Sequence, residues 1–336
     1  MKVLFIGGTG LISTAVSKLA VEKGFELYLL NRGLRNENVP IGAKIIQGNI
    51  RDIKATKQAL KDYKFDVVVN WIGFLPETVE NDIELFKGKI SQYIYISSAS
   101  AYQKPSAHYI VTESTPLANS HWEYSRNKIA SEERLMKEYR DNGFPFTVVR
   151  PTFTYGDAMI PASINSWSKP YSLIDRMKKG KKIIVQGDGS SLWTMTHNTD
   201  FAKGFVGLIG NIHAIGHAFH ITSDEVLTWD QIYETIGMTV GVKPNIIHIP
   251  SDFIIAFCPE EEGNLLGDKA VSVVFDNTKI KSYVPDFKAT TDFSAGVRKS
   301  VEYFQAHSDK CSIDEEWNAT MDKIIAAYET GLPTTK

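Results

Sequence analysis

The chain has 336 residues, of which 43% are hydrophobic and 23% are charged, as is usual for a folded globular protein. The formal net charge is −2, so no basic excess points to a nucleic-acid partner. The two cysteines, Cys258 and Cys311, lie far apart in the sequence, which argues against a disulfide framework and against a cysteine-based zinc site.

The first half of the chain alternates short β-branched runs with amphipathic helical stretches. Several of the runs are apolar at consecutive positions, which is typical of parallel strands covered on both faces. Strands are predicted at residues 2–6, 26–30, 44–47, 66–69, 92–97 and 146–150, and helices at 11–23, 53–63, 77–86 and 122–142. This alternation predicts an α/β fold with a Rossmann-type, doubly wound parallel sheet.

The pattern becomes less regular after residue 150. A loop is expected first, and the elements after it are predicted as a helix at 172–179, a strand at 182–186, a helix at 199–209, a strand at 218–221 and a mainly helical tail with one extended run at 245–249. We therefore expect a dinucleotide-binding core at residues 1–150, to which residues 182–222 return, and a smaller C-terminal substrate-binding lobe made of residues 151–181 and 223–336.

A glycine-rich turn follows the first predicted strand and opens the first helix. Gly7 and Gly10 allow a tight turn and a close approach of the backbone to a pyrophosphate, and the helix start at Leu11 and Ile12 attracts that anion. The third glycine position of the pattern holds Ser13, which is small enough for helix–strand packing. The turn predicts a bound dinucleotide.

The end of the second strand indicates which dinucleotide binds. An acid there would hold the 2′-hydroxyl of the adenosine ribose, whereas an arginine suits a 2′-phosphate. The acid is missing and Arg32 is available, so we expect NADP or NAD, with NADP preferred. After the third strand, Asn49 and Ile50 are candidates to flank the adenine, although Ile50 fits an ordinary core position equally well.

A serine, a tyrosine and a lysine are candidates for catalysis at a carbonyl group. Ser98 directly follows the fifth predicted strand, and Tyr124 and Lys128 share one face of the long helix. Free tyrosine has a pKa of about 10, and a nearby ammonium favours the phenolate. Tyr124 is thus the candidate general acid or base, Ser98 the candidate donor to the carbonyl oxygen, and Lys128 a candidate ligand of the nicotinamide ribose.

These pieces together resemble the extended short-chain dehydrogenase/reductase superfamily, and most of all its NAD-dependent epimerase/dehydratase family. The segments that carry the resemblance are residues 7–13, 95–102, 124–128, 149–156 and 187–202. The resemblance implies catalysis by Ser98, Tyr124 and Lys128, a C-terminal lobe that closes over the substrate, and a homodimer. It also implies cofactor contacts at Gly7, Gly10, Leu11, Ile12, Arg32, Asn49 and Gly73.

Three departures from the family pattern narrow the chemistry. Phe153 replaces an asparagine and Trp193 an arginine that commonly hold a sugar-nucleotide diphosphate, and an aromatic ring cannot neutralise that anion. Ala99-Ser100 replaces the Asp-Glu pair of sugar dehydratases. We expect four aromatic side chains to line a pocket for a sugar ring or an aromatic group: Phe153, Trp167, Tyr171 and Trp193.

Three functions stay open from the sequence. The first is an NAD(P)-dependent oxidoreductase that acts on a hydroxyl or carbonyl of a small, sugar-like substrate. The second is a nucleotide-sugar epimerase. The third is a cofactor-sensing or RNA-binding protein without turnover, because the sequence also resembles the group that contains chloroplast stem-loop-binding proteins. The near-neutral charge and the intact Ser98, Tyr124 and Lys128 favour an enzyme over an RNA-binding protein.

The sequence also bears on metal binding, membrane insertion and cellular location. His213, His217 and His220 lack acidic or cysteine partners at ligand spacing, so no metal site is expected. The N-terminus has no signal-peptide pattern, and no apolar stretch approaches the roughly 20 residues that span a bilayer. We expect a cytoplasmic protein with a small-molecule substrate and without a nucleic-acid or membrane partner.

Overall fold

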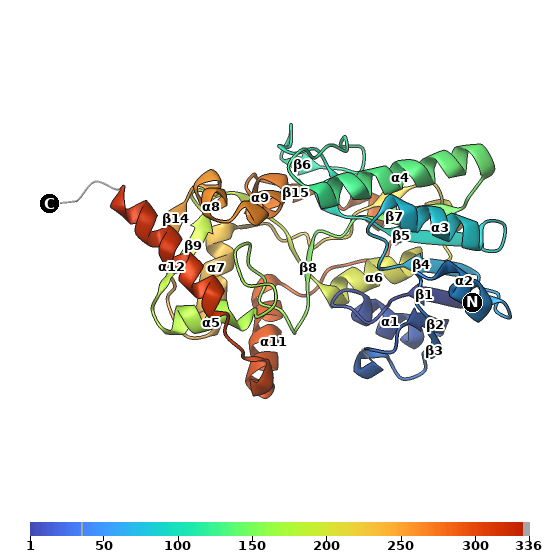
Figure 1. Cartoon of the computed structure of the whole chain (residues 1–336), viewed down its shortest axis with the longest axis horizontal. Helices are drawn as coiled ribbons and strands as arrows, with labels where there is room; N and C mark the ends of the chain where they lie inside the picture. Colours follow the sequence, from blue (N-terminus) through green and yellow to red (C-terminus); the bar gives the residue numbers. More distant parts are fainter. Residues whose placement is uncertain (35, 332–336) are drawn as a thin grey trace.

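A seven-stranded parallel sheet forms the centre of the larger part of the molecule (Figure 1). We describe residues 1–34 and 36–331 of a computed structural model. The strands in spatial order are β12 (Ala218–Phe219), β7 (Phe146–Val149), β5 (Gln92–Ile96), β4 (Val67–Asn70), β1 (Lys2–Ile6), β2 (Glu26–Asn31) and β3 (Lys44–Gln47). Each strand is parallel to its neighbours, which confirms the predicted α/β, doubly wound class.

Helices cover both faces of this sheet, and the sequence of β1 explains how. Val3 and Phe5 face one core with α1 (Ser13–Glu22) and α6 (Asn198–Leu208), whereas Leu4 and Ile6 face a second core. That second core lies under α3 (Pro76–Phe86) and α4 (Glu123–Asn142), with α2 (Ile53–Leu60) nearby. Because successive side chains of a strand point to opposite faces, a strand buried on both sides is apolar at every position.

The remaining chain forms a smaller lobe, on the left of Figure 1. Its centre is a parallel pair of strands, β9 (Lys182–Gln186) and β14 (Asn245–Ile249). The helices around the pair are α5 (Tyr171–Lys178), α7 (Trp229–Thr239), α8 (Ser251–Phe257), α11 (Phe293–Ala306) and α12 (Glu315–Thr330). Buried aromatic and aliphatic side chains from these elements make two further cores.

Short elements complete the two parts. β8 (Phe153–Tyr155) pairs in parallel with β11 (Met195–His197), inside a stretch expected as loop. The other short pieces are β6 (Ile110–Val111) with β15 (Val274–Phe275), β10 (Leu192–Trp193) with β13 (Leu227–Thr228), α9 (Glu262–Asn264) and α10 (Thr278–Tyr283). No helix among the described residues is both long and apolar enough to cross a lipid bilayer.

One expected boundary needs correction. The strand predicted at residues 182–186 forms, but it does not return to the large sheet, because its register is with β14, from Lys182 opposite Asn245 onward. The return of the chain begins with α6, which packs on α1, and β12 then pairs with β7. Ile280 and Phe287 from the C-terminal part also enter the core beside α6.

Candidate active site

The glycine-rich turn after β1 has the backbone geometry that a bound dinucleotide needs. Gly7 and Gly8 have φ angles of 93° and 99°, a region that side chains with a Cβ rarely adopt. A Cβ on Gly8 would also lie 2.8 Å from Cδ2 of Leu29. The helix α1 that follows begins without a side-chain cap, and the partial positive charge at its start attracts an anion.

The space beside the turn is open toward such a ligand. A Cβ on Gly10 would meet only the hydroxyl of Ser13, at 3.4 Å, among the described atoms within 4 Å. Ser13, in the third glycine position, accepts a 2.8 Å hydrogen bond from the N–H of Gly10. From the start of α6, Asn198 donates a 2.8 Å hydrogen bond to the carbonyl of Leu11. The residues of the turn therefore fit a dinucleotide phosphate, and α6 holds the turn in shape.

The other candidate cofactor residues lie at the same edge of the sheet. Arg32 is exposed directly after β2, and Asn49 is exposed after β3. Ile50 is buried in the core below α3, so its packing alone accounts for its presence. Gly73 is buried after β4, and its carbonyl accepts a 3.1 Å hydrogen bond from the hydroxyl of Tyr95.

A chain of serine hydroxyls joins the end of β5 to α4. The Oγ atoms of Ser98 and Ser100 lie 2.8 Å apart, and Ser125 of α4 donates a 2.7 Å hydrogen bond to Ser100. Ser125 is the neighbour of Tyr124, so this chain fixes the strand end relative to the phenol. Ser98 and Tyr124 both line one cavity of about 420 Å³.

Lys128 lies one helical turn beyond Tyr124 and is almost fully buried, with 2% of its surface exposed. Its ammonium donates 2.7 Å hydrogen bonds to the carbonyls of Gly73 and Ile96. The nitrogen lies 5.6 Å from the centre of the Tyr124 ring and 4.9 Å from that of Phe74. Lys128 thus joins the loop after β4, the end of β5 and helix α4 at one point.

The direction of the pKa shift of Tyr124, beside Lys128, differs from the one expected from the sequence. Burial lowers the pKa of Lys128 to about 7, because removal from water disfavours the ammonium. Burial also raises the pKa of Tyr124, although its interaction with the Ser98 hydroxyl opposes the rise. A lowered pKa was expected for Tyr124. The structure gives the opposite direction, since desolvation is the largest influence on this partly buried phenol.

Aromatic side chains make much of the cavity wall. Phe153, Trp167 and Trp193 contribute to its lining, and the rings of Phe153 and Trp167 stack with centres 6.2 Å apart. Trp167 remains 60% exposed. The expectation for Tyr171 is corrected: it does not line the cavity, because its ring packs against Phe304, with centres 5.6 Å apart.

The cavity also contains residues that the sequence reasoning missed. Trp122 lies beside Tyr124, with ring centres 5.0 Å apart. Asp268 and Lys269 line the wall as well, although they follow Tyr124 by more than a hundred residues. No local motif marks these two residues, because only the fold of the lobe brings them to the site. Within the described part of the chain, no group of His, Cys, Asp and Glu could hold a metal ion.

The chain is similar to known proteins over most of its length. Residues 3–222 match the NAD dependent epimerase/dehydratase family. The chain belongs to this family. The resemblance seen in the sequence is thereby confirmed.

Proteins similar in sequence to this chain differ in function. The chain is 28% identical over 267 residues to the chloroplast stem-loop binding protein of 41 kDa b of Arabidopsis thaliana, covering 75% of this chain and 67% of that protein. It is 21% identical to 2′-dehydrokanamycin reductase of Streptomyces kanamyceticus, covering 75% and 70%. It is 26% identical to UDP-glucose 4-epimerase of Lactobacillus helveticus, covering 56% and 62%.

Solved structures confirm the fold of the epimerase/dehydratase family. An epimerase from Methanothermobacter thermautotrophicus superposes with a TM-score of 0.75 at 16% identity, covering 92% of this chain and 93% of that one. A dTDP-glucose 4,6-dehydratase from Bacillus anthracis, in complex with NAD, superposes with a TM-score of 0.73 at 18% identity, covering 92% and 98%. The dehydratase and a UDP-glucose 4-epimerase from Thermus thermophilus are complexes with NAD, in agreement with a nicotinamide dinucleotide as the family's cofactor.

Proposed function

We propose that this protein is an NAD(P)-dependent oxidoreductase that acts on a hydroxyl or carbonyl of a small, sugar-like substrate, with Tyr124 transferring the proton. One observation carries the proposal: Leu11, from the glycine-rich turn, and Ser98 and Tyr124 line the same cavity. A dinucleotide held by the turn would therefore meet a substrate beside the phenol.

The residues have separate roles in this chemistry. The nicotinamide, when bound, supplies the hydride to the carbonyl carbon. Tyr124 donates its hydroxyl proton to the carbonyl oxygen, and Ser98 donates a hydrogen bond to the same oxygen. The raised pKa of Tyr124 keeps the phenol protonated at neutral pH, which suits a proton donor and favours reduction of a carbonyl.

The cofactor would be held by the residues at the sheet edge. Gly7, Gly10, Leu11 and Ile12 would contact the pyrophosphate, Asn49 the adenine end, and Gly73 and Lys128 the nicotinamide end. The exposed Arg32 supports NADP over NAD, because a guanidinium pairs with a 2′-phosphate through two parallel hydrogen bonds. A homodimer and a cytoplasmic location stay predictions.

A cofactor titration followed by a substrate panel tests this proposal. We expect NADPH and NADH to bind with micromolar affinity, and NADPH to bind more tightly. We also expect small hydroxylated ketones and aldehydes to oxidise the bound cofactor, followed as loss of absorbance at 340 nm. A protein that binds neither cofactor, or that binds one and oxidises it with no carbonyl compound, would contradict the proposal.

Nucleotide-sugar epimerisation is the second candidate, favoured by the similarity to UDP-glucose 4-epimerase. Phe153 and Trp193 argue against it, because neither ring offers a charge to a diphosphate. Cofactor that co-purifies with the protein, together with conversion of UDP-glucose to its 4-epimer without net redox change, would favour this candidate over the reductase.

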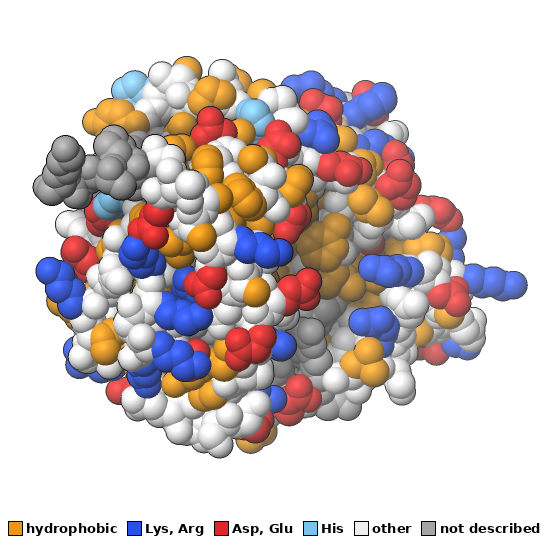
Figure 2. Space-filling model, turned by 60° about the vertical axis from the view of Figure 1, so that its left-hand side comes forward, with side chains coloured by type: hydrophobic (Ala, Val, Ile, Leu, Met, Phe, Trp, Pro, Cys, Tyr) orange, Lys and Arg blue, Asp and Glu red, His pale blue; other side chains and the backbone are white. Residues whose placement is uncertain are grey.

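RNA binding is the third candidate, because of the similarity to a stem-loop binding protein. Acidic and basic side chains are interspersed over the face in Figure 2, which offers no extended basic surface to a phosphate backbone. Retention of a stem-loop RNA at low salt that persists in Lys128→Met would favour this candidate instead.

A further inference from the structure

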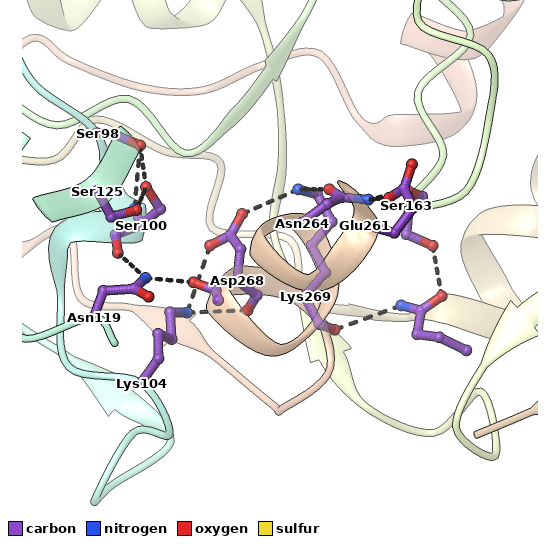
Figure 3. Close-up of polar contacts among 12 residues, drawn as sticks. Ser98, Ser100, Lys104, Asn119, Ser125, Ser163, Glu261, Asn264, Asp268 and Lys269 are labelled. Atoms are coloured by element: carbon purple, nitrogen blue, oxygen red, sulfur yellow. Dashed lines mark hydrogen bonds and ion pairs between the residues drawn. The ribbon is translucent and has the colours of Figure 1, made fainter. Parts of the chain in front are cut away.

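One wall of the cavity comes from a segment far away in the sequence. The chain leaves α9 and widens into a π-helix at Leu265–Lys269, whose last two residues, Asp268 and Lys269, line the cavity. π-helical turns are rare and occur frequently at functional sites. Figure 3 shows this segment facing Ser98 and Ser100 at the end of β5.

The two residues belong to a row of alternating charges. Lys104 lies 3.5 Å from Oδ1 of Asp268, and the ammonium of Lys269 lies 3.1 Å from Oδ2. Lys269 also donates a 2.6 Å hydrogen bond to Oδ1 of Asn264. Lys104 and Lys269 are buried, and Asp268 is partly exposed to the cavity. The carboxylate thus lies between the two lysine side chains and keeps lone pairs for a ligand.

The segment is fixed to the proposed active site on two sides. Asn119 donates 2.8 Å and 2.7 Å hydrogen bonds to the carbonyls of Ser100 and Gly267. Trp122 packs so closely on Gly263 that a Cβ there would lie 2.3 Å from the indole. Because these contacts join the π-helix to the loop after β5, and the adjoining α9 to the start of α4, Asp268 has a defined position relative to Tyr124.

We infer that Asp268 and Lys269 form a polar subsite that selects an uncharged, hydroxylated substrate and positions its reacting carbon against Tyr124. The inference rests on the proposed function. Asp268 accepts a hydrogen bond from one substrate hydroxyl, and Lys269 donates to a neighbouring oxygen. The ring of the substrate stacks on the aromatic wall that includes Trp167 and Phe153.

The composition of the wall disfavours a diphosphate. Among the described residues that line the cavity, Lys269 is the only cation, and its ammonium is already shared by Asp268 and Asn264. A diphosphate would place its charges beside the carboxylate of Asp268, with only Lys269 among the described lining residues to offset them. A hydroxyl group suits the wall better, because Thr154 and Trp193 have buried polar atoms without a partner among the described residues.

Saturation-transfer NMR on the protein saturated with NADP⁺ tests the subsite. The probes are methyl β-D-glucopyranoside, myo-inositol and UDP-glucose, and the variants are Asp268→Asn and Lys269→Met. The matched controls are Asp62→Asn and Lys64→Met, which change exposed residues. We expect signals from the ring protons of at least one uncharged probe, an affinity loss of about tenfold or more in both variants, and unchanged affinity in both controls.

A second readout separates a binding role from a purely structural one. Asp268 raises the pKa of Tyr124 through its charge, so Asp268→Asn is expected to move the alkaline limb of the pH–rate profile to lower pH, whereas Asp62→Asn is not. Three results would overturn the inference: no signal from either uncharged probe, unchanged affinity in both variants, or tighter binding of UDP-glucose than of the uncharged probes. If NADP⁺ and NAD⁺ both fail to bind, the proposed function itself fails.

Discussion

The ammonium of Lys128 donates a 2.7 Å hydrogen bond to the carbonyl of Gly73 and thereby ties helix α4 to the loop after β4. The same nitrogen binds the carbonyl of Ile96 at the end of β5. Three neighbouring elements of the sheet edge thus meet at one buried cation. This contact holds the backbone beside the proposed nicotinamide position in a fixed shape.

Because Lys128 is buried, the free energy of unfolding should depend on pH above neutrality. The pKa of this lysine is about 7 in the folded protein and 10.5 in the unfolded chain, so the unfolded chain binds more protons between these values. The free energy of unfolding should therefore rise as pH increases from 7 toward 10, by at most roughly 1.4 kcal/mol per pH unit. Urea unfolding at pH 7 and pH 9.5 measures the slope. Lys128→Met should lose it, whereas Lys64→Met should keep it; equal slopes in the two variants would refute the assignment.

Asp82 should make the free energy of unfolding decrease as pH rises, which is opposite to the effect of Lys128. Burial raises its pKa from 3.8 to about 6, although Tyr93 and Asn70 donate hydrogen bonds to it. The folded state retains a proton that the unfolded chain has lost, so stability falls as pH rises from about 4 to about 6, by up to about 3 kcal/mol. Relative to Asp82→Asn, the wild type should lose stability over this range and level off above it. A constant difference in urea midpoint between the two proteins would contradict this prediction.

Arg32 is the residue proposed to set the choice between the two cofactors. Arg32→Ala removes the cation proposed to pair with the 2′-phosphate, so the Kd for NADPH should rise about tenfold, while the Kd for NADH changes less than about twofold. Fluorescence titration of both cofactors measures the two constants, with Arg140→Ala on α4 as the control. Equal weakening of both cofactors would assign Arg32 to general charge attraction.

Gly8 tests the geometry of the phosphate turn. Alanine there meets both a φ of 99° and a contact of 2.8 Å with Leu29, whereas alanine at Gly24 meets a φ of 83° and no atom within 4 Å. Gly24→Ala should cost about 1 kcal/mol of backbone strain, and Gly8→Ala about 1–3 kcal/mol more from overpacking. Thermal unfolding of the two variants compares these costs. Equal costs would mean that the space behind Gly8 is not tight.

The strands of the large sheet could be predicted because their burial on both faces leaves continuous apolar runs, as in Val3, Leu4 and Phe5. The glycine turn and the Tyr124–Lys128 spacing are likewise local patterns, so sequence was enough to find them. The pairing of β9 with β14 was missed, since a short apolar strand carries no sign of which sheet it joins.

Other features of the site depend on contacts between distant parts of the chain. Asp268 and Lys269 reach the cavity only through the fold of the lobe, and Tyr171 turns away from the cavity to pack on Phe304. The direction of the Tyr124 pKa shift was also missed. The spacing to Lys128 reveals a neighbouring amine, but it does not reveal that burial weakens the charge of that amine.

The most direct test of the account is Tyr124→Phe, measured for turnover and for cofactor affinity in the same preparation. Removal of one phenolic oxygen should lower kcat by about 10²–10⁴-fold and leave the Kd of NADPH within about twofold. Tyr109→Phe, at an exposed position, should leave both values unchanged. Full activity in Tyr124→Phe would contradict the assignment of the proton donor, and with it the proposed enzyme mechanism.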